Sequence, residues 1–200
     1  QRSCYLAMFR GCTSLEKAPE LPALDLAEAC YSEMFRRCSS LKVAPKLPAQ
    51  ELCDGCYYWM FGECTRLEAI ELPAKEAEYW SYHSMFRGCN SLKTIKLGLK
   101  SCGQDILGGW LSDASETGQI ICTPEFLKSI QEIIEAEEDN TDVENIPEGW
   151  KLVSEYTNDS SLKESIWTII SFPTRMFNIL TTADIVLKKV GILSFLVLSK

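Results

Sequence analysis

Apolar and polar positions recur along the first half of the chain with a period of 25 or 26 residues. The segment Cys4–Leu15 is matched by Cys30–Leu41, then by Cys56–Leu67 and Ser81–Leu92. Self-similarity at a fixed period of this length is the signature of a repeat architecture, in which each repeat is one structural unit. The pattern therefore predicts four equivalent units between residue 4 and about residue 100.

Large apolar residues occupy the same positions in every repeat, whereas the positions between them vary. A repeat of this size cannot bury its apolar face alone, so stability must come from stacking against its neighbours. We therefore expect each column to lie along a common axis, with Phe9, Phe35 and Phe61 one above another. The columns are Tyr5, Tyr31, Tyr57 and Tyr82; Met8, Met34, Met60 and Met85; Phe9, Phe35, Phe61 and Phe86; and Leu15, Leu41, Leu67 and Leu92.

Two conformations are predicted within each repeat. Leu26, Cys30, Met34 and Cys38 are spaced four residues apart, which places them on one helical face. The stretch Leu41–Pro48 contains two prolines and cannot continue a helix, so we expect a short strand and a turn there. The predicted fold class is an α/β solenoid with leucine-rich-repeat-type coils, each contributing one short strand and one helix.

The repeat consensus resembles a known family. Met-Phe-x-Gly-Cys-Thr-Ser-Leu, followed by Ala-Pro-Glu-Leu-Pro-Ala and Leu-Ala-x-x-Cys-Tyr, is similar to the BspA-like leucine-rich repeats of bacterial surface proteins. The segment from Gly109 to Trp150 resembles the one that closes such arrays. Ser81 and Gly98 depart from the pattern in the fourth repeat. The resemblance implies a secreted or cell-surface protein used in adhesion, and it supplies no site residues.

The chain is predicted to have three parts. Residues 1–101 form the repeats, and residues 102–156 form a closing segment whose amphipathic helix starts at Pro124, after an N-cap at Thr123. Residues 157–200 form a hydrophobic helical tail. Three interpretations of this tail remain open: it packs on the repeats, it docks through residues 160–200 to a partner subunit or membrane interface, or it begins a membrane anchor. Its longest charge-free stretch has ten residues, whereas a helix that spans a bilayer needs roughly 20.

Composition and charge exclude several classes of partner and of functional site. A net charge of −8 argues against nucleic acid as a partner, because binding to phosphates needs clustered basic residues. The single histidine, His83, rules out a multi-histidine metal site, and the chain contains no phosphate-binding loop. We expect no catalytic activity, cofactor or metal.

Most of the ten cysteines lie at or next to equivalent positions of the repeats. The two cysteine columns are eight residues apart, roughly 12 Å along a helix, beyond the roughly 7 Å limit for a disulfide. Buried, reduced thiols packing as small apolar groups are the first interpretation, and disulfides along the stack are the alternative. Cys53 and Cys56 form a Cys-x-x-Cys pair, but no second pair of ligands accompanies them.

One set of aromatic residues is a candidate ligand-binding site. These residues stand where the first two repeats carry small or charged side chains, and exposed aromatic patches mark interaction sites. The alternative is that they pack under the closing segment or tail. Arg10, Arg36 and Arg87 share another column, a ridge that Glu28 and Glu33 partly neutralise. The candidate site residues are Tyr58, Trp59, Tyr79, Trp80 and His83.

The functional hypothesis is a non-catalytic, secreted or cell-surface repeat protein of bacterial type that mediates adhesion or binds a protein or carbohydrate. The alternative is a structural or assembly component whose hydrophobic C-terminal tail docks to a partner subunit or membrane.

Overall fold

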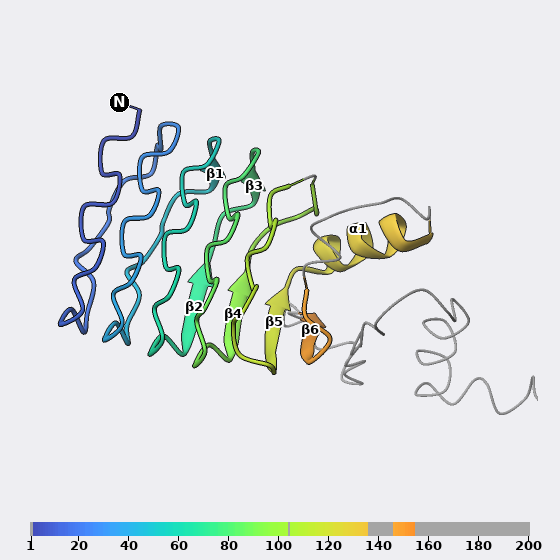
Figure 1. Ribbon diagram of the computed structural model, residues 1–200. Helices are drawn as coiled ribbons and strands as arrows, with labels where there is room; N and C mark the ends of the chain where they lie inside the picture. Colours follow the sequence, from blue (N-terminus) through green and yellow to red (C-terminus); the bar gives the residue numbers. More distant parts are fainter. Residues whose placement is uncertain (1, 104, 136–145, 155–200) are drawn as a thin grey trace, which may run out of the picture.

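A computed structural model describes residues 2–103, 105–135 and 146–154 of the chain. Apart from one helix at the end of the stack, this part of the chain winds into successive coils, which we call rungs, that lie side by side in sequence order (Figure 1). The larger sheet consists of β2 (Ala69–Leu72), β4 (Thr94–Leu97), β5 (Gly118–Cys122) and β6 (Trp150–Ser154), in that order and all parallel. A smaller parallel sheet pairs β1 (Glu51–Leu52) with β3 (Glu76–Ala77).

The register of the larger sheet places equivalent residues opposite one another. Ile70 pairs with Ile95, and Ile95 pairs with Ile120, so one apolar row crosses the sheet. Alternate residues of β2 are buried and exposed, as expected for a strand with one face on the core. An isolated parallel bridge between Lys17 and Val43 continues this side into the first two repeats.

Aromatic columns fill the core between the rungs. The ring centroids of Phe9 and Phe35 are 5.6 Å apart, and those of Phe35 and Phe61 are also 5.6 Å apart. Their planes are nearly parallel, at 5° and 9°. The tyrosine column stacks in the same way, with 6.2 Å between Tyr31 and Tyr57. These contacts confirm the predicted stacking of the phenylalanines.

The predicted helix in each repeat is wrong, because the segment from Ala29 to Cys38 is a series of tight turns. Every fourth residue has a positive φ, as at Glu33 (54°) and Arg37 (64°). Cys30 N donates to Ala27 O within its own rung, whereas Tyr31 N donates to Cys56 O in the next. A helix would send each N–H four residues back along the same chain. Both conformations repeat about every four residues, so the apolar spacing could not distinguish them.

We call these stretches the turn segments, and a fifth one follows those of the four predicted repeats. Positive φ values recur at Asp105, Gly109 and Asp113, four residues apart. Phe86 N donates to Trp110 O at 2.9 Å, so this stretch continues the pairing between rungs. The backbone repeat thus extends past residue 101, where the sequence pattern dissolves. The five turn segments are residues 3–12, 29–38, 55–64, 80–89 and 105–113.

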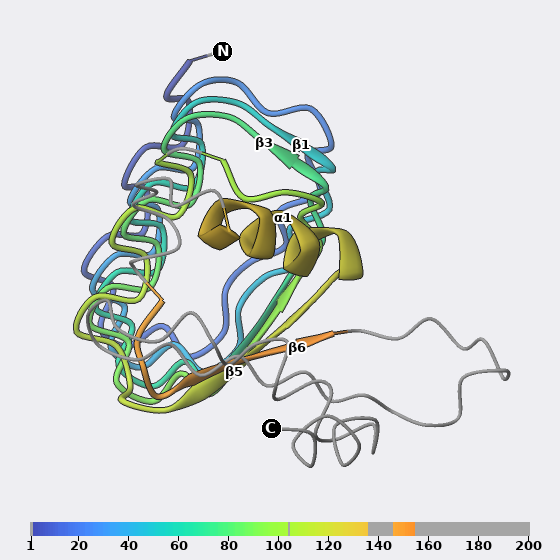
Figure 2. The same ribbon diagram turned by 90° about the vertical axis from the view of Figure 1, so that its right-hand side faces the viewer.

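The described residues contain a single α-helix, α1 (Pro124–Glu135), which lies across the end of the stack (Figure 2). It begins where the sequence places it, and Phe126 N donates to Thr123 Oγ1 at 3.1 Å. Phe126 and Ile130 are fully buried in the core. The helix therefore covers apolar side chains that the last rung would otherwise expose.

The predicted hydrophobic tail, residues 157–200, lies outside the described residues. Among the described residues, none of the helical segments has the length and the apolar character of a membrane span.

The cysteine columns make a repeated contact between rungs. Cys64 Sγ donates to Phe35 O at 3.1 Å, and Cys89 Sγ donates to Phe61 O at 3.1 Å. All ten cysteines are free thiols. Burial raises the pKa of the Cys89 thiol to about 12 and raises that of Cys64 as well. These buried thiols therefore remain protonated at neutral pH and act as hydrogen-bond donors.

Candidate functional site

Four of the five candidate residues come together as one aromatic cluster. Tyr58 stacks on His83 with ring centroids 5.4 Å apart, because the two occupy one column in adjacent rungs. Trp80 lies 5.8 Å from His83 and 6.3 Å from Tyr58. Tyr79 stacks on Trp80 at 4.7 Å. We call this set, Tyr58, Tyr79, Trp80 and His83, the aromatic patch.

The outer half of the aromatic patch is open to solvent. Tyr79 is 46% exposed and Trp80 is 45% exposed, whereas Tyr58 and His83 are partly buried beneath them. Trp80 has a φ of 58°, in the left-handed region that side chains rarely adopt. The inter-rung bond from Trp80 N to Asp105 O, 3.1 Å long, holds the backbone in this turn. The patch is therefore positioned by a fixed backbone.

His83 is held as a neutral ring at the base of the patch. Its Nδ1 is buried and has no hydrogen-bond partner among the described residues. Gly108 lies so close that a Cβ there would be 2.5 Å from that atom. Burial lowers the pKa of the imidazole, and the opposing attraction to Asp105 is the smaller effect. The ring therefore contributes an uncharged surface at neutral pH.

Trp59, the fifth candidate, belongs to a different surface. Trp59 follows Tyr58 in the turn segment, and its side chain packs against Gly62. The Arg36 guanidinium carbon lies 4.0 Å from the Trp59 ring centroid, and that of Arg87 lies 5.4 Å away. Glu63 in turn pairs with Arg36 at 3.4 Å. Trp59 is thus occupied by cation–π contacts within the molecule.

The arginine ridge is largely neutralised by its neighbours. Glu33 Oε2 lies 3.0 Å from Arg10 Nη1 and 2.8 Å from Arg36 Nη1, so one carboxylate joins two rungs. Glu28, the other carboxylate expected here, pairs with Arg2 instead. The pair between Arg36 and Glu33 is partly buried, with side chains 19% and 21% exposed, whereas Arg10 is 41% exposed. The ridge is therefore a charge network that presents little free positive charge.

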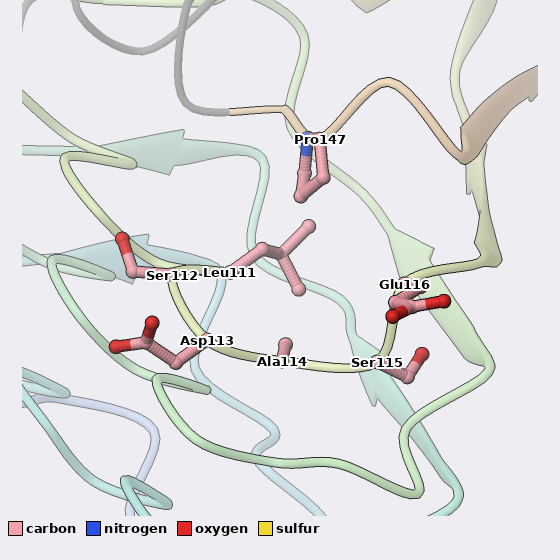
Figure 3. Close-up of a pocket in the computed structure, with 7 residues that line it drawn as sticks. All are labelled: Leu111, Ser112, Asp113, Ala114, Ser115, Glu116 and Pro147. Carbon is pink, nitrogen blue, oxygen red and sulfur yellow. The ribbon is translucent and has the colours of Figure 1, made fainter.

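A small pocket of about 260 Å³ lies beside the fifth turn segment (Figure 3). Leu111 points toward Pro147 across it, whereas Asp113 and Glu116 stand at its two ends (Figure 3). Asp113 pairs with Arg87 at 3.2 Å, and Ser115 Oγ donates to Thr117 O at 2.8 Å. Its polar groups are thus largely engaged within the molecule.

A larger open groove, of about 580 Å³, lies on the side of the molecule that carries β1 and β3. Sequence reasoning missed it, although the acidic column Asp25, Glu51 and Glu76, offset by 26 and 25 residues, was a visible signal. We call it the acidic groove. Its lining residues are Leu24, Asp25, Leu26, Pro48, Gln50, Glu51, Leu52, Cys53, Glu76, Ala77 and Glu78.

The chain has no significant match among protein-family models, curated proteins or solved structures. The resemblance to BspA-like repeats, and with it the leucine-rich-repeat class, therefore stays a prediction from the sequence.

Proposed function

We propose that this protein is a non-catalytic, secreted or cell-surface repeat protein that binds a protein or carbohydrate ligand on the aromatic patch. One observation carries the proposal: Tyr79 and Trp80 stack at 4.7 Å while each remains nearly half exposed. Large aromatic side chains left in water mark interaction sites, because a ligand that covers them recovers their hydrophobic free energy.

The scaffold beneath the patch suits this role. Tyr58 and His83 support the exposed rings from adjacent rungs, and backbone bonds between rungs fix all four positions. A rigid platform loses little conformational entropy on binding. His83 lies between Tyr58 and Gly108 and gives the exposed rings an uncharged support. The rings of Tyr79 and Trp80 can stack against the flat apolar face of a sugar or an aromatic side chain.

The test is binding of the full chain to an array of immobilised glycans and extracellular-matrix proteins. Alanine at Tyr79 or Trp80 is expected to weaken binding at least about tenfold, since truncating an aromatic hot spot costs about 2 kcal/mol or more. Tyr5→Ala is the matched control, because Tyr5 is also 46% exposed but belongs to the first rung, outside the patch.

The control variant should bind as the unchanged protein does, and all three variants should keep their melting temperature within a few degrees. Binding that survives both Tyr79→Ala and Trp80→Ala would show that the patch is not the site. A chain that binds nothing on the array would contradict the proposal itself.

A further inference from the structure

The first two rungs hold two cysteines of one column next to each other. Tyr5 N donates to Cys30 O at 2.9 Å, which pairs the backbone after Cys4 with the second rung. The rings of Tyr5 and Tyr31, the residues that follow the two cysteines, stack 5.5 Å apart. Backbones joined in this parallel way lie roughly 4.8 Å apart, inside the range of about 4.4–6.8 Å between the Cα atoms of a disulfide. The backbone therefore places Cys4 and Cys30 within reach of a covalent bond.

The side chains of this pair are oriented differently from those of the second cysteine column. The Cys30 thiol contacts both the Cys4 thiol and the backbone of Ala27. Cys38, the equivalent residue of the second column, donates from its Sγ to Phe9 O at 3.0 Å. Its thiol is thus directed at a carbonyl oxygen rather than at the cysteine above it. Cys4 and Cys30 are therefore the pair whose sulfur atoms already approach each other.

Solvent reaches one thiol of the pair much more readily than the other. Cys4 is exposed, whereas Cys30 is only 3% exposed. Burial raises the pKa of the Cys30 thiol. Because only a thiolate attacks a disulfide, an oxidant from solvent reacts first at Cys4. Cys30 is then the adjacent thiol that can displace the adduct, which is the arrangement that converts two thiols into a disulfide.

We propose that Cys4 and Cys30 are a site of oxidative modification, at which a small-molecule disulfide such as glutathione disulfide joins the first two rungs covalently. The Cys4 thiolate attacks one sulfur of glutathione disulfide, which forms a mixed disulfide and releases one glutathione thiolate. The Cys30 thiol then loses its proton to solvent, and its sulfur attacks Cys4 Sγ and releases the second glutathione thiolate. Two protein thiols are thus oxidised to one disulfide, and one glutathione disulfide is reduced to two glutathione molecules, which take up the two protons.

The disulfide holds the first rung against the second. Opening of an end rung is a local fluctuation that costs less than unfolding of the whole stack. A bond between residues 26 positions apart opposes this opening, because it restricts the chain when the rung is open. The proposal does not rest on the aromatic patch, since Tyr79 and Trp80 belong to the fourth rung. Disulfides persist in oxidising compartments, which include the outside of a cell.

The experiment reduces the full chain, removes the reductant and adds glutathione disulfide at about pH 8. Mass spectrometry of the proteolytic peptides then follows each disulfide and each glutathione adduct with time. The disulfide between Cys4 and Cys30 should form at least about tenfold faster than any other pair, because the two thiols are already in contact. Cys12, which is also exposed, should retain its glutathione, because the thiol of Cys38 is directed elsewhere.

Two matched variants each remove one exposed thiol: Cys4→Ser removes it from the pair, and Cys12→Ser removes it from the second column. Amide hydrogen exchange is measured over residues 5–11, which include the N–H groups of Tyr5 and Phe9 that donate to the second rung. Oxidation should slow this exchange at least about tenfold in the unchanged protein and in Cys12→Ser, because the cross-link opposes opening of the first rung. In Cys4→Ser, oxidation should change the exchange rate by less than about twofold.

A lasting glutathione adduct at Cys4 would overturn the proposal, because Cys30 would then be unable to displace it. A disulfide between Cys12 and Cys38 that forms equally fast would also overturn it, since a shared column alone would then be sufficient. Formation of the Cys4–Cys30 disulfide without slower exchange in residues 5–11 would show that the bond does not hold the first rung.

Discussion

The first rung and the third rung carry the same apolar columns, yet equivalent side chains are buried to very different extents in the two rungs. Met8 is 60% exposed, whereas Met60 is fully buried, although both precede a phenylalanine in the same turn. The third rung has a described neighbour on each side, and the first rung has one only on the side of the second. Burial is therefore a property of the stack, supplied by adjacent rungs rather than by the residue or its own rung.

The largest expected effect of this difference is on thiol reactivity. Cys12 and Cys64 occupy one column, but Cys12 is exposed, whereas Cys64 is fully buried and its pKa is raised by burial. Only the thiolate reacts with alkylating reagents. Cys64 reacts only after unfolding, which costs about 5 kcal/mol or more, so Cys12 should be alkylated at least about 5 × 10³ times faster.

This ratio is measured by pulsed iodoacetamide labelling at pH 8, followed by mass spectrometry of the cysteine peptides. Cys89, with its pKa raised to about 12, should follow Cys64. Comparable labelling rates at Cys12 and Cys64 would contradict the difference in burial between the two rungs.

The next largest effect is on stability. Phe61 is fully buried and stacks on Phe35 and Phe86, so Phe61→Ala should cost about 3–5 kcal/mol of the free energy of unfolding. Phe9 is partly buried and stacks on Phe35 alone, so Phe9→Ala should cost less than half as much.

Urea unfolding followed by tryptophan fluorescence measures both values, and an unchanged m-value would show that the difference is one of stability. Equal costs at Phe9 and Phe61 would mean that stacking on two sides adds nothing to stacking on one.

The same comparison shows how far the sequence could predict this molecule. The columns of Phe9, Phe35 and Phe61 were predictable, because equivalent residues at a constant offset occupy equivalent positions. The turn segments were not, because their four-residue repeat matches the helical spacing closely. What distinguishes them is a positive φ at residues such as Glu33 and Arg37, which are not residue types that favour it.

The candidate site shows the same limit. Tyr58 and His83 could be assigned to one column from their offset, and they do stack. Trp59 is one residue further, but successive positions of a turn segment face different directions, so its ring meets Arg36 instead.

The smallest expected effect is on the pH dependence of stability, and it too differs between one rung and another. His83 occupies the column position that the first rung fills with Leu6, which cannot titrate. Burial lowers the folded-state pKa of His83 below its usual 6.5, and a protonated Nδ1 would find no hydrogen-bond acceptor among the described residues. The unfolded chain therefore takes up the proton more readily than the folded chain.

The direction of the pH effect on stability follows from this lowered pKa. The contribution of His83 to stability is fully present above about pH 6.5 and is lost as the pH falls below that value. The melting temperature should therefore fall more between pH 7.5 and pH 5.5 for the unchanged protein than for His83→Gln. Because His83 is the only histidine in the chain, carboxylate titrations common to both proteins cancel in the comparison. Parallel curves for the two proteins would show that Asp105 compensates fully for the burial of the ring.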